Sequence, residues 1–150
     1  MGLPYNLDDV RLRPGMCLPD ADGKFYDTAS AYLMGLDRAL DGEFLEGFHE
    51  WLVPQVGGGD NLAWFGLIMY IAFPRWDRRR TRVLNSTDDL VALECLFSCL
   101  EQFLAEKEQD QGLRSIQQRY QGYLESQEWY DPALHAMVKS VPGSGRIRSK

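Results

Sequence analysis

The chain has 150 residues, of which 45% are hydrophobic and 25% are charged, and it carries a net charge of −6 with a pI near 4.9. A chain of this length and composition is typical of one globular domain with its own hydrophobic core. The acidic balance disfavours general nucleic-acid binding, which requires a basic surface, and it favours a basic partner.

Proline and glycine occur too often in residues 1–27 for a helix, so this segment is predicted to be irregular. Beyond it, apolar residues recur at spacings of three and four, which predicts amphipathic helices separated by breaks at Asp41-Gly42, Pro54 and Gly112. In chain order the expected helices cover residues 27–40, 43–53, 61–73, 86–107 and 113–124, followed by a short helical turn that starts near Asp131-Pro132.

The stretch from Asn61 to Pro74, NLAWFGLIMYIAFP, has no polar stripe. A helix that is apolar on all sides must be covered on all sides, so residues 61–73 are expected to form the buried centre of the core. The other helices are amphipathic and therefore suited to surround it. The predicted fold is all-α, a single-domain bundle of five or six helices within residues 1–140, followed by a disordered tail at 141–150.

The sequence also predicts where the protein acts. No signal peptide is expected, because the N-terminus MGLPYNLDDV lacks a basic region and an apolar run. The stretch 61–73 is shorter than the roughly 20 apolar residues that span a bilayer. Three cysteines without a secretory signal indicate free thiols in a reducing compartment, so a cytoplasmic protein is expected.

The residues suggest no catalytic or metal site. Only His49 and His135 are available as histidine bases, and a serine nucleophile requires a partnered base. Glu46 and His49 have the spacing of one ligand pair of a di-iron site, but such a site needs a second pair. A zinc site needs four ligands, so Cys95 and Cys99 are predicted to be small buried hydrophobic residues. We therefore expect no enzyme activity, no metal and no cofactor.

Charge is unevenly distributed along the chain. Residues 1–73 carry four basic and eleven acidic side chains, whereas residues 74–82 carry five basic and one acidic. The basic run RWDRRRTR includes Trp76, whose ring offers a stacking surface, so nucleic-acid contact is one interpretation. A solvated loop that pairs with acidic neighbours is the plainer interpretation, and we prefer it. The arginines concerned are Arg75, Arg78, Arg79, Arg80 and Arg82.

The acidic residues of the first half form the opposite feature. Such a face often serves solubility alone, but it also suits a cationic protein, because complementary charge speeds encounter and sets specificity. The residues predicted to bind a partner are Asp37, Asp41, Glu43, Glu46 and Glu50, with Asp60 nearby.

Several short segments follow one another in a recognisable order. They are RLRPGMCL at 11–18, AYLMGLDRA at 31–39, FLEGFHEWL at 44–52, NLAW at 61–64 and STDDLVALECLFSCLEQFL at 86–104. This order resembles a group of small all-helical bacterial immunity proteins that accompany polymorphic and contact-dependent toxins. The resemblance covers about residues 12–104 and brings no catalytic residues with it. Cys17 and Pro19 depart from the pattern, in which an aromatic residue and a glycine are expected.

The resemblance implies a cytosolic immunity protein that binds and neutralises a cognate toxin without catalysis. The acidic surface suggests that this toxin is basic, for example a cationic nuclease whose phosphate-binding site an acidic inhibitor would cover. No membrane association is expected. The alternative belongs to a different class, a helical regulator that contacts nucleic acid through the Arg75–Arg82 loop.

Overall fold

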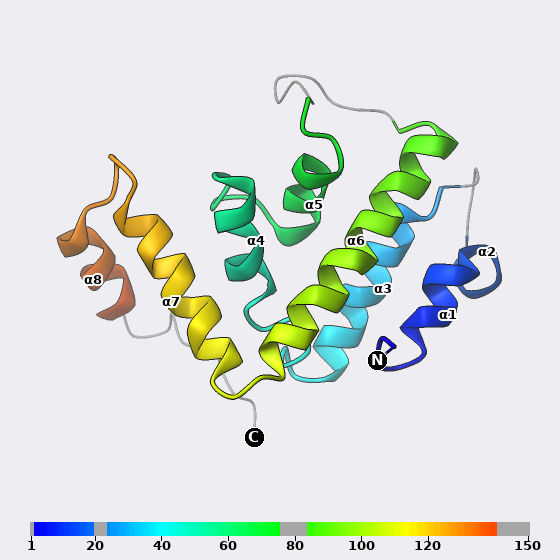
Figure 1. Cartoon of the computed structure of the whole chain (residues 1–150), viewed down its shortest axis with the longest axis horizontal. Coiled ribbons are helices and arrows are strands. Elements are labelled where there is room, and N and C mark those ends of the chain that lie inside the picture. Colours follow the sequence, from blue (N-terminus) through cyan, green and yellow to red (C-terminus); the bar gives the residue numbers. More distant parts are fainter. Residues whose placement is uncertain (1, 20–23, 76–83, 141–150) are drawn as a thin grey trace.

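The computed structural model describes residues 2–19, 24–75 and 84–140, and within these ranges it contains eight α-helices and no strand. The expected all-α bundle is confirmed (Figure 1). The helices are α1 (Leu7–Leu12), α2 (Pro14–Cys17), α3 (Tyr26–Ala39), α4 (Phe48–Val56), α5 (Trp64–Ala72), α6 (Ser86–Lys107), α7 (Gly112–Glu125) and α8 (Pro132–Ser140).

The long helix α6 is the centre of the bundle. It packs against α1, α3, α4, α5 and α7 (Figure 1). Its start is fixed by Asn85, whose side-chain oxygen accepts a hydrogen bond from the backbone N–H of Asp88 at 2.8 Å. Its buried apolar residues cover more than one face of the helix, so neighbours can pack on both sides. They are Ala92, Leu93, Leu96, Phe97, Cys99, Leu100 and Phe103.

The position expected for α5 requires a correction. Leu67 and Ile68 are fully buried, but Phe65 keeps 40% of its surface exposed. The helix has nine residues and packs mainly against α4 and α6, so one of its sides faces solvent. The expectation that residues 61–73 form the buried centre is therefore wrong. Hydrophobicity predicts that a helix is buried, whereas its length and its number of neighbours decide which helix lies at the centre.

The N-terminal segment is more ordered than expected. Residues predicted to be irregular form α1 and α2, and Pro14 occupies the first position of α2, where its missing N–H is not needed. Leu7 and Val10 of α1 are buried. The guanidinium of Arg11 pairs with Glu94 and, at 2.9 Å, with Glu101, which ties α1 to α6. The prediction of an irregular segment was wrong because the residues that α1 contacts in α6 lie far from it in the sequence.

The helix predicted at 43–53 also begins and ends elsewhere. Gly42 and Gly47 have φ angles of 76° and 92°, a left-handed conformation that favours glycine, and α4 begins only at Phe48. Pro54 lies inside α4 instead of ending it, because a proline near the end of a helix removes a single hydrogen bond. The shifted start places residues 43 and 46 in the turn that precedes α4.

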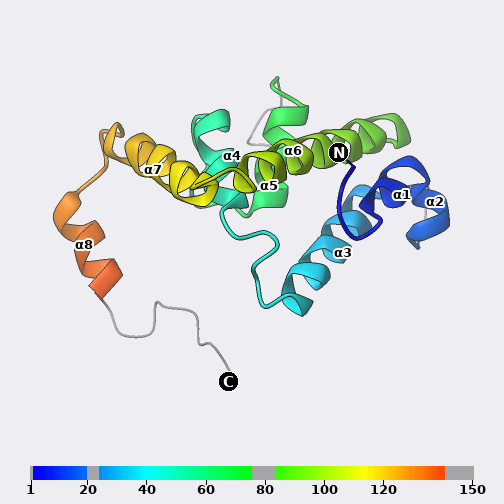
Figure 2. The same cartoon turned by 60° about the horizontal axis from the view of Figure 1, so that its bottom comes forward.

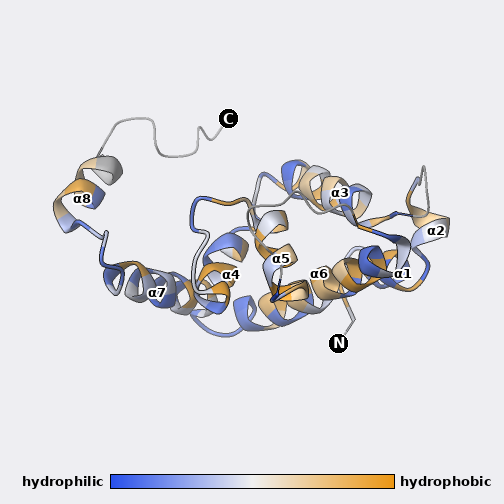
Figure 3. Ribbon diagram, turned by 90° about the horizontal axis from the view of Figure 1, so that it is seen from above, coloured by the Kyte–Doolittle hydropathy of each residue, from blue (hydrophilic) through white to orange (hydrophobic). Residues whose placement is uncertain are grey.

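The C-terminal helices lie at one edge of the molecule. Helix α7 packs on α4 and α6, and α8 lies beyond α7 (Figures 1 and 2). Coloured by hydropathy, α7 is mostly hydrophilic, whereas hydrophobic segments gather in α4, α5 and α6 (Figure 3). In the described part of the chain no helix is both long and apolar enough to cross a membrane. The tail predicted to be disordered, 141–150, lies outside the described residues.

Candidate partner-binding surface

The turn between α3 and α4 begins with the hydrogen bonds that end α3. The N–H of Gly42 donates to the carbonyl of Asp37 at 2.7 Å, and the N–H of Asp41 donates to that of Arg38 at 3.2 Å. Asp41 and Gly42 both have left-handed backbones, which turn the chain away from the helix axis. The side chain of Asp41 is consequently exposed.

Two side chains hold the rest of this turn in place. The carboxylate of Asp37 accepts a hydrogen bond from the N–H of Leu45 at 2.8 Å. Lys107, at the end of α6, donates from Nζ to the carbonyls of Glu43 at 2.5 Å and Phe44 at 3.4 Å. Its ammonium also lies 5.4 Å from the centroid of the Phe103 ring. The turn therefore has a defined backbone, although it is not helical.

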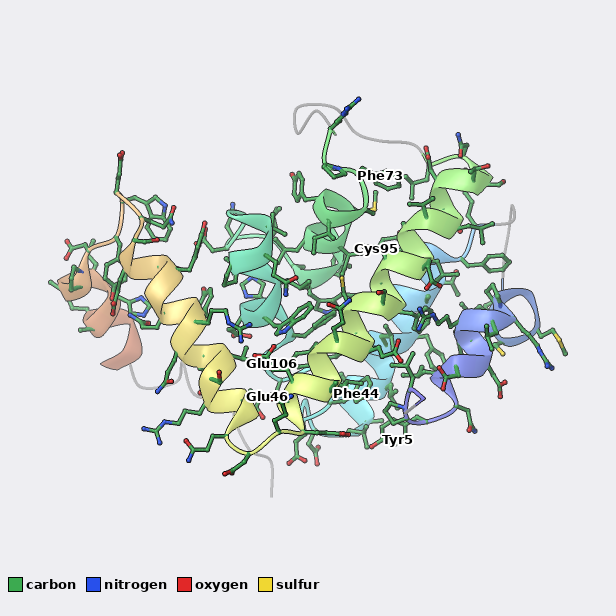
Figure 4. The ribbon with its side chains drawn as sticks, in the orientation of Figure 1. Tyr5, Phe44, Glu46, Phe73, Cys95 and Glu106 are labelled. Carbon is green, nitrogen blue, oxygen red and sulfur yellow. The ribbon has the colours of Figure 1, made fainter. Side chains whose placement is uncertain are left out.

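A pocket of about 370 Å³ opens beside the turn. Its walls are Tyr5, Ala39, Leu40, Asp41, Glu43 and Phe44. The ring of Tyr5 meets that of Phe44 edge-on, with centroids 5.6 Å apart (Figure 4). Phe44 is buried, whereas Tyr5 keeps 54% of its surface exposed. The pocket thus combines apolar residues with Asp41 and Glu43, two exposed acids from the set that the sequence predicts to bind a partner.

The remaining predicted residues lie elsewhere. Glu50 lies in α4, and Asp60 lies in the loop that follows it. Burial raises the pKa of the Tyr120 phenol in α7, and the nearby charges of Asp60 and Glu50 raise it further. The ring of His49 lies edge-on to Tyr120, with centroids 6.1 Å apart. Glu46 is half-buried, and in the view of Figure 4 it lies toward α7, on the opposite side of Phe44 from Tyr5. The predicted acidic face is therefore divided into two groups.

Glu106 joins three helices, a role that the sequence pattern did not reveal. Its carboxylate accepts a hydrogen bond from Nε1 of Trp51 at 2.7 Å and pairs with the guanidinium of Arg119. The hydrogen bond from Arg119 lowers the pKa of Glu106, with a further contribution from Trp51. Its partners connect α4, α6 and α7, so Glu106 supports the α4–α7 side of the surface rather than forming part of it.

The two cysteines of α6 lie against each other. The hydrogen bond with Cys99 and the burial of the thiol raise the pKa of Cys95, whose Sγ lies 3.9 Å from the carbonyl oxygen of Ile68. Among the residues that the structure describes, no three histidine, cysteine, aspartate or glutamate side chains come together as metal ligands. Cys95 contacts α5, and Cys99 is buried in the core.

Iodoacetamide should modify Cys17 at least about tenfold faster than Cys95 or Cys99 in the folded protein, because the thiolate is the nucleophile and must be accessible. Cys17 is exposed, Cys99 is buried, and Cys95 is half-buried with a raised thiol pKa. Mass spectrometry over time should show one adduct, mapped to Cys17, before any other. In denaturant the three cysteines should react at similar rates. Equal rates in the folded protein would contradict the protection of Cys95 and Cys99 by the fold.

The basic run lies at the edge of the described structure. Arg75, which follows α5, is exposed. Arg78, Arg79, Arg80 and Arg82 lie outside the described residues, as does Trp76. The nucleic-acid interpretation therefore depends on the sequence alone.

Comparisons of the chain with protein-family models, with curated proteins and with solved structures give no match. The fold and the surface define an all-α protein with an acidic, pocketed turn. The resemblance to immunity proteins continues to depend on the sequence segments quoted above.

Proposed function

We propose that the protein is an immunity-type protein that binds and neutralises a basic toxin in the cytoplasm without catalysing a reaction. The observation that carries the proposal is the α3–α4 turn, where Asp41 and Glu43 are exposed on a backbone held by Asp37 and Lys107. A surface fixed before binding loses little conformational entropy when a partner docks. Its charge favours a cationic partner.

Both histidine rings lie in aromatic contacts. The ring of His49 packs against Tyr120, and the ring of His135 lies 5.5 Å from that of Tyr130. His49 lies in α4 and Tyr120 in α7, so their contact joins two helices, whereas Tyr130 lies in the segment between α7 and α8.

The proposal is tested by capturing the partner from a lysate of the native cells. The bound proteins are identified by mass, including the product of the adjacent reading frame. A one-to-one complex with the C-terminal fragment of a large secreted protein supports the proposal if co-expression also restores growth of cells that make that fragment. Recovery of nucleic acid, lost when the arginines at 75–82 become alanine, would instead favour the regulator.

Reversal of two charges at the turn tests which acidic group meets the partner. The double change Asp41→Lys and Glu43→Lys should slow association by about tenfold at low salt and should weaken its dependence on ionic strength. Stopped-flow association rates at several salt concentrations measure both effects. The matched control is Glu50→Lys with Asp60→Lys, in the group near Tyr120. If only the control slows association, the interface lies along α4 and α7.

A further inference from the structure

The pocket beside the α3–α4 turn has two chemically distinct parts. Its lining includes the apolar and aromatic residues Leu40, Phe44 and Tyr5 and the acidic residues Asp41 and Glu43, which are both exposed. Neither carboxylate has a hydrogen-bond or ion-pair partner among the described residues. The charged groups are therefore accessible next to an apolar surface.

A long basic side chain matches both parts of this pocket. Lysine and arginine have an apolar stem and a charged head, and the stem commonly packs on apolar surface while the head stays near polar groups. A cationic head could approach the carboxylates and also the exposed ring of Tyr5, since aromatic faces attract cations. An anionic group would be repelled, and an apolar side chain would desolvate the carboxylates without compensation.

Lys107 gives an example of such recognition on the same turn. Its ammonium lies over the Phe103 ring and bonds to the carbonyls of Glu43 and Phe44. That cation is engaged by backbone oxygens and by a ring that does not line the pocket. Neither Lys107 nor Phe103 is among the residues that line the pocket.

The wall formed by Tyr5 is held in position by the N-terminal segment. The N–H of Leu7 donates to the carbonyl of Pro4 at 3.1 Å, and the N–H of Leu3 donates to the carboxylate of Asp8 at 2.8 Å. The edge-on contact with Phe44 fixes the ring on its other side. The wall therefore exists before any ligand arrives.

We propose that this pocket receives an arginine or lysine side chain presented by a partner protein, with Asp41 and Glu43 on the cationic head and with Tyr5, Leu40 and Phe44 along the stem. This proposal deepens the proposed function and rests on it for the identity of the partner. The binding chemistry can be tested without that partner.

The probe is the peptide acetyl-Gly-Arg-Gly-amide, titrated into the full chain and followed by two-dimensional NMR. Resonances of Tyr5, Asp41, Glu43 and Phe44 should shift and saturate with a Kd on the order of 1–10 mM, as befits a single side chain. The matched control peptide carries citrulline, which has nearly the shape of arginine but no charge. Its shifts should be smaller and should not saturate. Equal shifts for both peptides, or shifts confined to other residues, would overturn the proposal.

Variants test the roles of the named groups. Asp41→Asn with Glu43→Gln should weaken arginine-peptide binding at least about fivefold, and Tyr5→Ala should weaken it by a similar factor. The control pair, Glu50→Gln with Asp60→Asn, should leave it unchanged. Dispersed amide spectra establish that each variant is folded. Unaltered binding in Asp41→Asn with Glu43→Gln would exclude the pocket.

The pocket and the proposed function can fail separately. Toxin capture without arginine-peptide binding would refute the pocket but leave the immunity function standing. Saturable binding of the arginine peptide, with no protein partner captured, would keep the cation pocket and remove the immunity function.

Discussion

Replacement of Phe48 by alanine is expected to lower the free energy of unfolding by about 3–5 kcal/mol. Phe48 is fully buried at the start of α4. Its ring lies 5.0 Å from that of Phe103 in α6 and 5.7 Å from that of Trp64 in α5, measured between centroids. Its removal therefore leaves a cavity where three helices meet.

Unfolding in urea, followed by tryptophan fluorescence, measures this loss. Because a domain of this size is stable by about 5–15 kcal/mol, the variant would keep only a fraction of its stability. The matched control is Phe65→Ala in α5, which removes an aromatic ring that is 40% exposed and should cost about 1 kcal/mol. If the two changes cost the same, the core would be centred on α5, as its hydrophobicity alone suggested.

Local signals explain why some helices were predicted accurately. The expected range 86–107 coincides with α6, because Asn85 caps its first turn and the apolar residues behind it keep a regular spacing. Helix α7 begins one residue before its predicted start at Leu113 and ends one residue after Leu124. In both helices the information is contained within the segment itself.

Distant contacts explain the helices that were missed. Helix α1 has only six residues and would be marginal alone. Arg11 connects it to Glu94 and Glu101, which lie 83 and 90 residues further along the chain. No local pattern contains such a pairing, so the proline-rich composition alone predicted an irregular segment.

In the candidate site, too, some residues can be predicted from their own segment, whereas others depend on contacts between distant segments. Asp41 and Glu43 were predicted from charge alone, and both are exposed beside the pocket. Tyr5 was missed, because only the packing of the N-terminal segment brings it to Phe44. Asp37 belonged to the same predicted set, yet its carboxylate is used within the chain to hold the turn. Charge in a sequence does not distinguish an acid that binds a partner from one that supports a loop.

Asp89 is a second acid with a role inside the protein, and Asp89→Ala is expected to lower the free energy of unfolding by about 2–4 kcal/mol. The residue is 2% exposed and lies in the first turn of α6. Its carboxylate accepts hydrogen bonds from the N–H groups of Phe25 at 2.6 Å and Tyr26 at 3.1 Å, at the start of α3. Alanine would remove this acceptor from both donors, of which the Tyr26 N–H is buried and the Phe25 N–H is part-buried. From its position in the sequence, Asp89 would be expected only to place a favourable charge in the first turn of α6.

Two controls separate this cap from a general effect on the start of α6. Asp89→Asn keeps one oxygen acceptor and should cost about half as much as alanine. Thr87→Ala, at an exposed position in the same turn, should change stability by no more than about 0.5 kcal/mol. Amide hydrogen exchange adds a local readout, since the loss of the cap should speed exchange in the first turn of α3 more than in α7. If Asp89→Ala destabilises the protein but leaves exchange in α3 unchanged, the carboxylate stabilises α6 itself and the contact between the two helices has another origin.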